Sequence, residues 1–91
     1  MFIQVRKGSK YFVTALWKET KGFAATIEES GGKHYEIYFS DVTGKFYKDR
    51  ENAKIAKYLC KALLDMAISK GIIFMSEIER ENALYWAGYQ E

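Results

Sequence analysis

Apolar and polar residues alternate in short runs through the first half of the chain, a pattern typical of β-strands. The runs are rich in aromatic, β-branched or threonine residues and cover residues 2–6, 11–18, 23–28, 34–40 and 45–48. Short turns that contain glycine separate them. Because connections this short cannot hold a crossover helix, we expect an antiparallel sheet of four to five hairpin-connected strands within residues 1–48.

Alternation along these strands assigns their side chains to two faces. The first face is almost wholly apolar and is the expected core face. The second face mixes polar side chains with large apolar ones, among them Phe12, Leu16 and Tyr38, and with the cationic Lys18. The expected core face comprises Ile3, Val5, Tyr11, Val13, Ala15, Trp17, Phe23, Ala25, Ile27, Tyr35, Ile37 and Phe39.

The second half of the chain has helical periodicity. Residues 50–70 contain no glycine or proline, carry a broad apolar arc, and follow Asp49 as a candidate N-cap. Gly71 and Ile72 are placed to close this helix with a Schellman turn. The apolar residues 72–75 are either another edge strand or a buried linker. Ser76 and Glu79 fit a capping box for a short helix over residues 77–88, so the fold class is α+β in a single domain, residues 1–91.

Composition supports a folded domain in a reducing compartment. Of the 91 residues, 48% are apolar and the net charge is only +2, which differs from the composition of a disordered chain. Cys60 is the only cysteine, and neither a signal peptide nor a membrane-spanning apolar stretch is visible. We therefore expect a cytoplasmic protein with no membrane partner.

Few residues of the chain are candidates for catalysis or for metal binding. His34 is the only histidine, and Cys60 falls on the apolar arc of the long helix, where a thiol behaves as a small hydrophobe. No spacing of zinc or calcium ligands occurs. Gly31, Gly32 and Lys33 lie between two predicted strands. They therefore predict a hairpin turn, because a phosphate loop would precede a helix. The sequence therefore predicts no catalytic set, no metal and no cofactor.

Two surfaces are candidates for binding a partner. On the second sheet face these are Phe12, Leu16 and Tyr38, and in the C-terminal helix Tyr85 and Trp86, since aromatic residues are the usual anchors of interfaces. The favoured alternative for the sheet face is that residues 72–89 cover it. Dimerisation and an ordinary half-wet surface are the other interpretations.

The sequence favours a non-catalytic protein-binding module, such as an adaptor or an inhibitor. Homodimerisation is the other mode of protein binding that the sequence leaves open. Small chains of this build are frequent among phage and mobile-element regulators. This link rests on general build and on no specific residue. The alternative function is nucleic-acid binding, through the aromatic–basic sheet face with Lys18 or through a basic stripe on the long helix. That stripe consists of Arg50, Lys54, Lys57 and Lys61.

Overall fold

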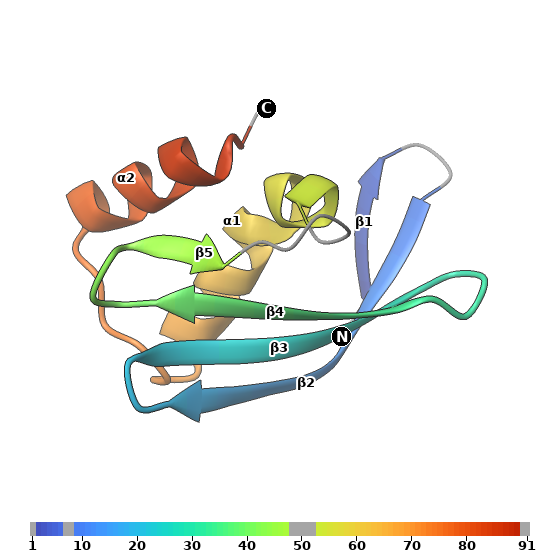
Figure 1. Ribbon diagram of the computed structural model, residues 1–91, viewed down its shortest axis with the longest axis horizontal. Helices are drawn as coiled ribbons and strands as arrows, with labels where there is room; N and C mark the ends of the chain where they lie inside the picture. Colours follow the sequence, from blue (N-terminus) through green and yellow to red (C-terminus); the bar gives the residue numbers. More distant parts are fainter. Residues whose placement is uncertain (1, 7–8, 48–52, 90–91) are drawn as a thin grey trace.

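Five strands and then two helices make up the chain in a computed structural model, which describes residues 2–6, 9–47 and 53–89 (Figure 1). Side chains are described for residues 11–47 and 55–89. The predicted N-cap Asp49 and the first predicted helical residue, Arg50, lie outside the described residues. The elements are β1 (Phe2–Arg6), β2 (Ser9–Glu19), β3 (Gly22–Glu29), β4 (His34–Ser40), β5 (Lys45–Tyr47), α1 (Ala53–Ser69) and α2 (Glu77–Ala87).

The strands form one antiparallel sheet in the order β1-β2-β3-β4-β5, which confirms the predicted series of hairpins. Gly22, where β3 begins, has φ +145°, a conformation that side-chain-bearing residues rarely adopt. A Cβ atom at this position would lie 1.8 Å from the carbonyl oxygen of Phe39 on β4. The close approach of β3 to β4 at this end of the sheet therefore requires glycine.

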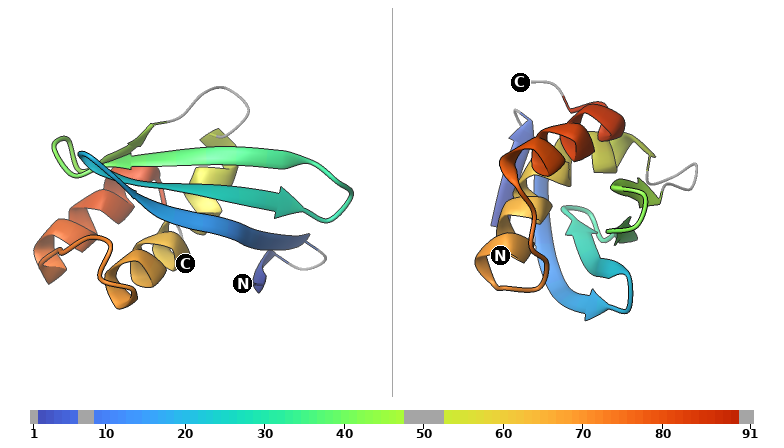
Figure 2. Two further views of the ribbon diagram at one scale, coloured as in Figure 1. Left: turned by 90° about the horizontal axis from the view of Figure 1, so that it is seen from below. Right: turned by 90° about the vertical axis from the view of Figure 1, so that its left-hand side faces the viewer.

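Both helices lie against the same face of the sheet, so the molecule has two layers (Figure 2). Between the layers, the ring of Phe39 lies 4.9 Å from that of Phe46 and 5.4 Å from that of Phe23, measured between centroids. Full burial of such side chains stabilises the fold by roughly 1.5–3 kcal/mol each. The largest fully buried side chains are Phe23, Ile27, Ile37, Leu59, Cys60, Leu63 and Leu64.

A β-bulge at Thr14 changes the facing of the second half of β2. Val13 pairs with Ile27, but the next pair is Ala15 with Thr26, so Thr14 is an extra residue in β2. Because the side-chain period of a strand is two, this insertion exchanges the faces of all the residues after it. The predicted facings of the four following residues are therefore wrong: Leu16 and Lys18 point to the helix side of the sheet, and Ala15 and Trp17 to the opposite side.

The turn after α1 is the predicted Schellman motif. Gly71 has φ +70°, its N–H donates to Ile68, and the Ile72 N–H donates to the Ala67 carbonyl. The linker that follows has no strand structure and is buried only in part, because Ile73 is 3% exposed and Phe74 is 90% exposed. The prediction of a buried linker thus holds for Ile73 and fails for Phe74.

Helix α2 packs on α1 and on the edge strand β5, on the helix side of the sheet (Figures 1 and 2). The predicted capping box is present, and the side chains of Ala83, Leu84 and Ala87 are buried. The expectation that residues 72–89 cover the second sheet face is wrong, because this segment lies on the other side of the sheet. No described part of the chain covers that face, which we call the open face.

Candidate functional site

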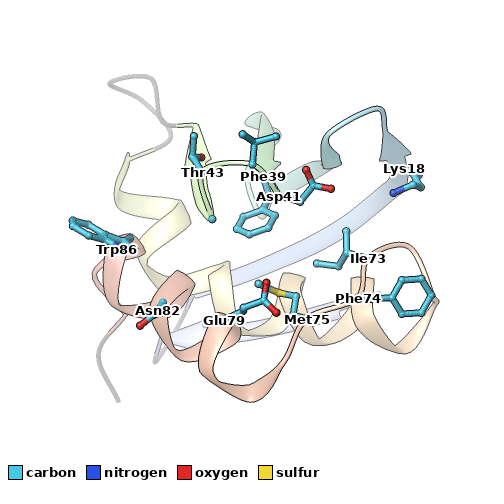
Figure 3. Close-up of a pocket in the computed structure, with 12 residues that line it drawn as sticks. Lys18, Phe39, Asp41, Thr43, Ile73, Phe74, Met75, Glu79, Asn82 and Trp86 are labelled. Atoms are coloured by element: carbon cyan, nitrogen blue, oxygen red, sulfur yellow. The ribbon is translucent and has the colours of Figure 1, made fainter.

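A cavity of about 410 Å³ opens at one end of the molecule, where the β4–β5 turn, the linker between α1 and α2, and α2 itself meet (Figure 3). Its apolar wall comes from Phe39 on β4 and from Ile73 and Met75 in the linker. Ile73 is anchored in the core, which fixes the linker beside the end of the sheet. The cavity is therefore the space between the sheet and the linker that core packing leaves open.

Three large apolar side chains stand at the rim of this cavity and extend into solvent. Val42 is 68% exposed, Phe74 90% and Trp86 55%. Figure 3 shows Phe74 and Trp86 at opposite sides of the cavity, with their rings pointing away from its centre. We call Val42, Phe74 and Trp86, together with the cavity between them, the end surface.

Local contacts hold two of these three side chains in place. The Ser40 hydroxyl accepts hydrogen bonds from the backbone N–H groups of Val42 (3.2 Å) and Thr43 (3.3 Å), which fixes the β4–β5 turn. The Lys45 ammonium lies 4.1 Å from the centre of the Trp86 ring, a cation–π contact between β5 and α2. The rim is thus built from the sheet and from α2 at once.

Side chains of positive and of negative charge line the cavity. Lys18 donates from Nζ to the Ile72 carbonyl at 3.2 Å and so ties β2 to the linker. The carboxylates of Asp41 and Glu79 also line the cavity. The backbone N–H of Ser76, and then its side chain, hydrogen-bond to Glu79 and lower the pKa of that carboxyl. Glu79 is therefore a fixed negative charge at the start of α2.

The structure distributes the predicted partner-binding residues over two surfaces. Trp86 stands on the end surface, and the ring of Tyr85, 78% exposed, packs edge-on against it with centroids 5.6 Å apart. Phe12 and Tyr38 lie on the open face, exposed by 40% and 38%. Leu16 was expected beside them, and this facing is wrong because the Thr14 bulge turns it to the helix side, where it is half-buried against the core.

Two exposed residues and the half-buried Trp17 escaped the sequence prediction. Phe74 and Val42 on the end surface were missed, although the apolar run 72–75 signalled that a side chain there required cover. Trp17 was missed because the bulge was not predicted. With Ala24, Tyr38 and Tyr47 it forms one row across β2 to β5 on the open face.

The predicted basic stripe is described only in part. The backbone of Lys54 is helical, Lys57 is half-buried with its Nζ 5.9 Å from the Tyr58 ring, and Lys61 is exposed. Arg50 lies outside the described residues. Lys18 faces the helix side, so it does not contribute to the open face. A nucleic-acid role for the helix stripe stays a prediction, whereas the aromatic–basic sheet face does not form as expected.

Of the two residues considered for catalysis, Cys60 lies away from both surfaces, and His34 lies on the open face where it pairs with Glu28. Cys60 is fully buried on α1, and its thiol donates to the Lys57 carbonyl at 3.6 Å. His34 is exposed where β4 begins. Among the described residues, no group of three or more His, Cys, Asp or Glu side chains is arranged to hold a metal ion. No helix within the described ranges is both long enough and apolar enough to cross a membrane.

Comparison with known proteins gives no relative: no family model, no curated protein and no solved structure matches this chain. Any assignment of function therefore rests on the geometry of the end surface and of the open face.

Proposed function

We propose that this chain is a non-catalytic protein-binding module whose partner docks on the end surface. The observation that carries the proposal is the exposure of Val42, Phe74 and Trp86 around one cavity. Large apolar side chains gathered at one place on a small domain are typical of interaction sites. Aromatic residues, tryptophan above all, supply most of the binding energy of interfaces.

The direction of the side chains favours a macromolecular partner over a small ligand. Phe74 and Trp86 point outward from the cavity instead of lining its depth (Figure 3). Outward rings insert into pockets of a partner, and the cavity between them accepts an apolar side chain in return. A small ligand in the cavity would leave most of the Phe74 ring in water, since that side chain is already 90% exposed.

The proposal also includes the class of protein, its location and its partner. We propose an adaptor or an inhibitor, because the end surface offers binding groups without a catalytic set beside them. We propose a cytoplasmic location, which the single cysteine supports, and the phage or mobile-element type remains part of the proposal. A second copy of the chain is the alternative occupant of the surface.

The test is affinity capture from the native host with a tagged chain, followed by measurement of the isolated partner's affinity. The double variant Phe74→Ser, Trp86→Ala removes the two outward rings and is expected to weaken binding at least about tenfold, the loss typical of central interface aromatics. Ile78→Ser is the matched control, because it removes an apolar side chain that is 73% exposed on α2 and does not line the end cavity. Circular dichroism establishes that each variant is folded.

Equal capture by the wild type and the double variant would contradict the proposal. Light scattering identifies self-association: a dimer that the double variant abolishes identifies a second copy as the partner.

A further inference from the structure

The open face carries a row of aromatic rings whose order is fixed by the strand register. Trp17 pairs with Ala24, Ala24 with Tyr38, and Tyr38 with Tyr47, so one line crosses β2, β3, β4 and β5. Ala24 is fully buried although both helices lie on the other face. Side chains of this face therefore cover its methyl group, and Trp17, Tyr38 and Tyr47 are the rings of the row.

Carboxylates are hydrogen-bonded to the edges of these rings. The Trp17 indole N–H donates to Glu19 at 2.9 Å, and the Tyr38 hydroxyl donates to Glu36. The bond to Glu36 raises the pKa of the Tyr38 hydroxyl, so Tyr38 remains a neutral donor. Each hydrogen bond restricts its ring and holds a carboxylate beside it.

Among the described side chains, carboxylates outnumber cations on the open face. Glu19 and Glu36 occupy the rows on either side of the aromatic row, and Glu28 lies one row beyond Glu36. Of the nearby cations, Lys18 faces the helix side and Lys45 has its ammonium on the Trp86 ring. Among the described strand residues, the His34 imidazole, opposite Glu28, and Lys45, which shares the row of Glu19, are the basic groups of this face. Lys21 and Lys33 lie in the turns at the two ends of β3.

We propose that the open face binds an extended segment of a protein partner that carries lysine or arginine side chains. Aromatic ring faces attract cations through their quadrupole, and the adjacent carboxylates supply the ion pair. An extended segment matches a pleated surface, since alternate side chains of a strand point the same way. The same carboxylates repel phosphates, so the face discriminates against nucleic acid.

This site adjoins the end surface, because Glu19, Tyr38 and Tyr47 line a second cavity together with Val42. It uses Trp17, Tyr38, Tyr47, Glu19 and Glu36, none of which lines the end cavity. The site is tested with a peptide in place of the captured partner, so its failure can be distinguished from failure of the proposed function. Together the two surfaces would allow one chain to contact two segments of a partner or two different partners.

The test is a fluorescence anisotropy titration of the full chain with a labelled peptide of alternating lysine and threonine, at low ionic strength. The same peptide with glutamate in place of lysine is the negative probe. We expect the lysine peptide to bind and the glutamate peptide not to bind. The variant Glu19→Gln, Glu36→Gln should weaken binding about fivefold to tenfold, because both ion pairs are lost while the rings remain.

The matched control is Glu77→Gln, Glu81→Gln, which removes the same charge from the exposed side of α2. It should leave the affinity for the lysine peptide within about twofold of wild type, the change that long-range charge alone produces. Tyr47→Ser, a substitution at a side chain 60% exposed, should weaken binding without affecting the fold.

Three outcomes would overturn the proposal. One is no binding of the lysine peptide by the wild type; another is an equal loss in the α2 control, which would indicate general charge attraction. The third is a dimer, detected by light scattering, that Tyr47→Ser dissociates, because a second copy would then occupy the face.

Discussion

The ammonium of Lys45 lies 4.1 Å from the centre of the Trp86 ring, so the short edge strand β5 and helix α2 meet through one cation–π contact. Lys45 belongs to the strand pair with Ser40, whose hydroxyl fixes the turn that carries Val42. The contact therefore couples the position of Trp86 to that of the β4–β5 turn. It links Trp86 to a turn that is distant from it in the sequence.

Replacing Lys45 with glutamine should loosen Trp86. A cation–π contact at an exposed site is worth about 0.5–1 kcal/mol, so the preference of the indole for its present position should fall by roughly twofold to fivefold. In a Trp17→Phe background Trp86 is the only tryptophan, and its quenching by acrylamide should increase. Lys33→Gln, with the same loss of charge in the β3–β4 turn, should leave quenching unchanged; equal changes in both variants would mean that the contact does not restrain the ring.

Replacing Gly22 with alanine should destabilise the fold strongly. The added Cβ would meet the Phe39 carbonyl oxygen at 1.8 Å, so β3 and β4 would have to separate at the end of the sheet beside the end cavity. We expect a loss of more than about 2 kcal/mol in the free energy of unfolding, from urea titrations. Gly31→Ala is the control, because φ is also positive there (+112°) but no atom lies within 4 Å of the added Cβ. Equal losses in the two variants would assign the effect to backbone strain alone.

Replacing Ser76 with alanine removes the N-cap of α2. The Ser76 hydroxyl accepts from the Glu79 N–H at 3.2 Å, and Glu79 in return accepts from the Ser76 N–H at 3.0 Å. Loss of a serine cap should cost about 1 kcal/mol of unfolding free energy, measured by thermal or urea denaturation. Ser69→Ala, a change at an exposed position in the last turn of α1, should have little effect.

The contribution of Glu79 should also depend on pH. The folded protein lowers the pKa of Glu79, so its stabilising effect is complete above the pKa of the unfolded chain and disappears as the pH falls through the folded pKa. The difference between wild type and Glu79→Gln should therefore shrink when unfolding is measured at increasingly acid pH. A difference that stays constant with pH would show that the charge of Glu79 is not involved.

Much of the fold could be predicted because it depends on local signals. The bounds of β1 and β4, the capping box at Ser76 and the Schellman turn at Gly71 all follow from residue type and spacing over a few positions. The bulge at Thr14 leaves no such signal. The sequence after the bulge fits either assignment of its side chains to the two faces, because Leu16 and Trp17 are adjacent and both are large and apolar. Packing of Leu16 against the core decides between the facings.

The candidate site was predicted only in part for a similar reason. Tyr85 and Trp86 were proposed as binding residues because the apolar residues of α2 do not form one buried stripe, and both side chains are exposed. The run 72–75 is uniformly apolar, and only the tertiary path of the linker determines that Ile73 enters the core while Phe74 faces solvent. The prediction that residues 72–89 cover the second sheet face failed because α2 packs against α1 and β5 instead.

The most direct test of the proposed function is amide hydrogen exchange of the full chain with and without the partner isolated by affinity capture. The account predicts added protection in the β4–β5 turn at residues 41–44, in the linker at 72–75 and along α2, with little change in α1. Protection confined to α1, with the turn and the linker exchanging as in the free chain, would contradict the claim that the end surface binds the partner.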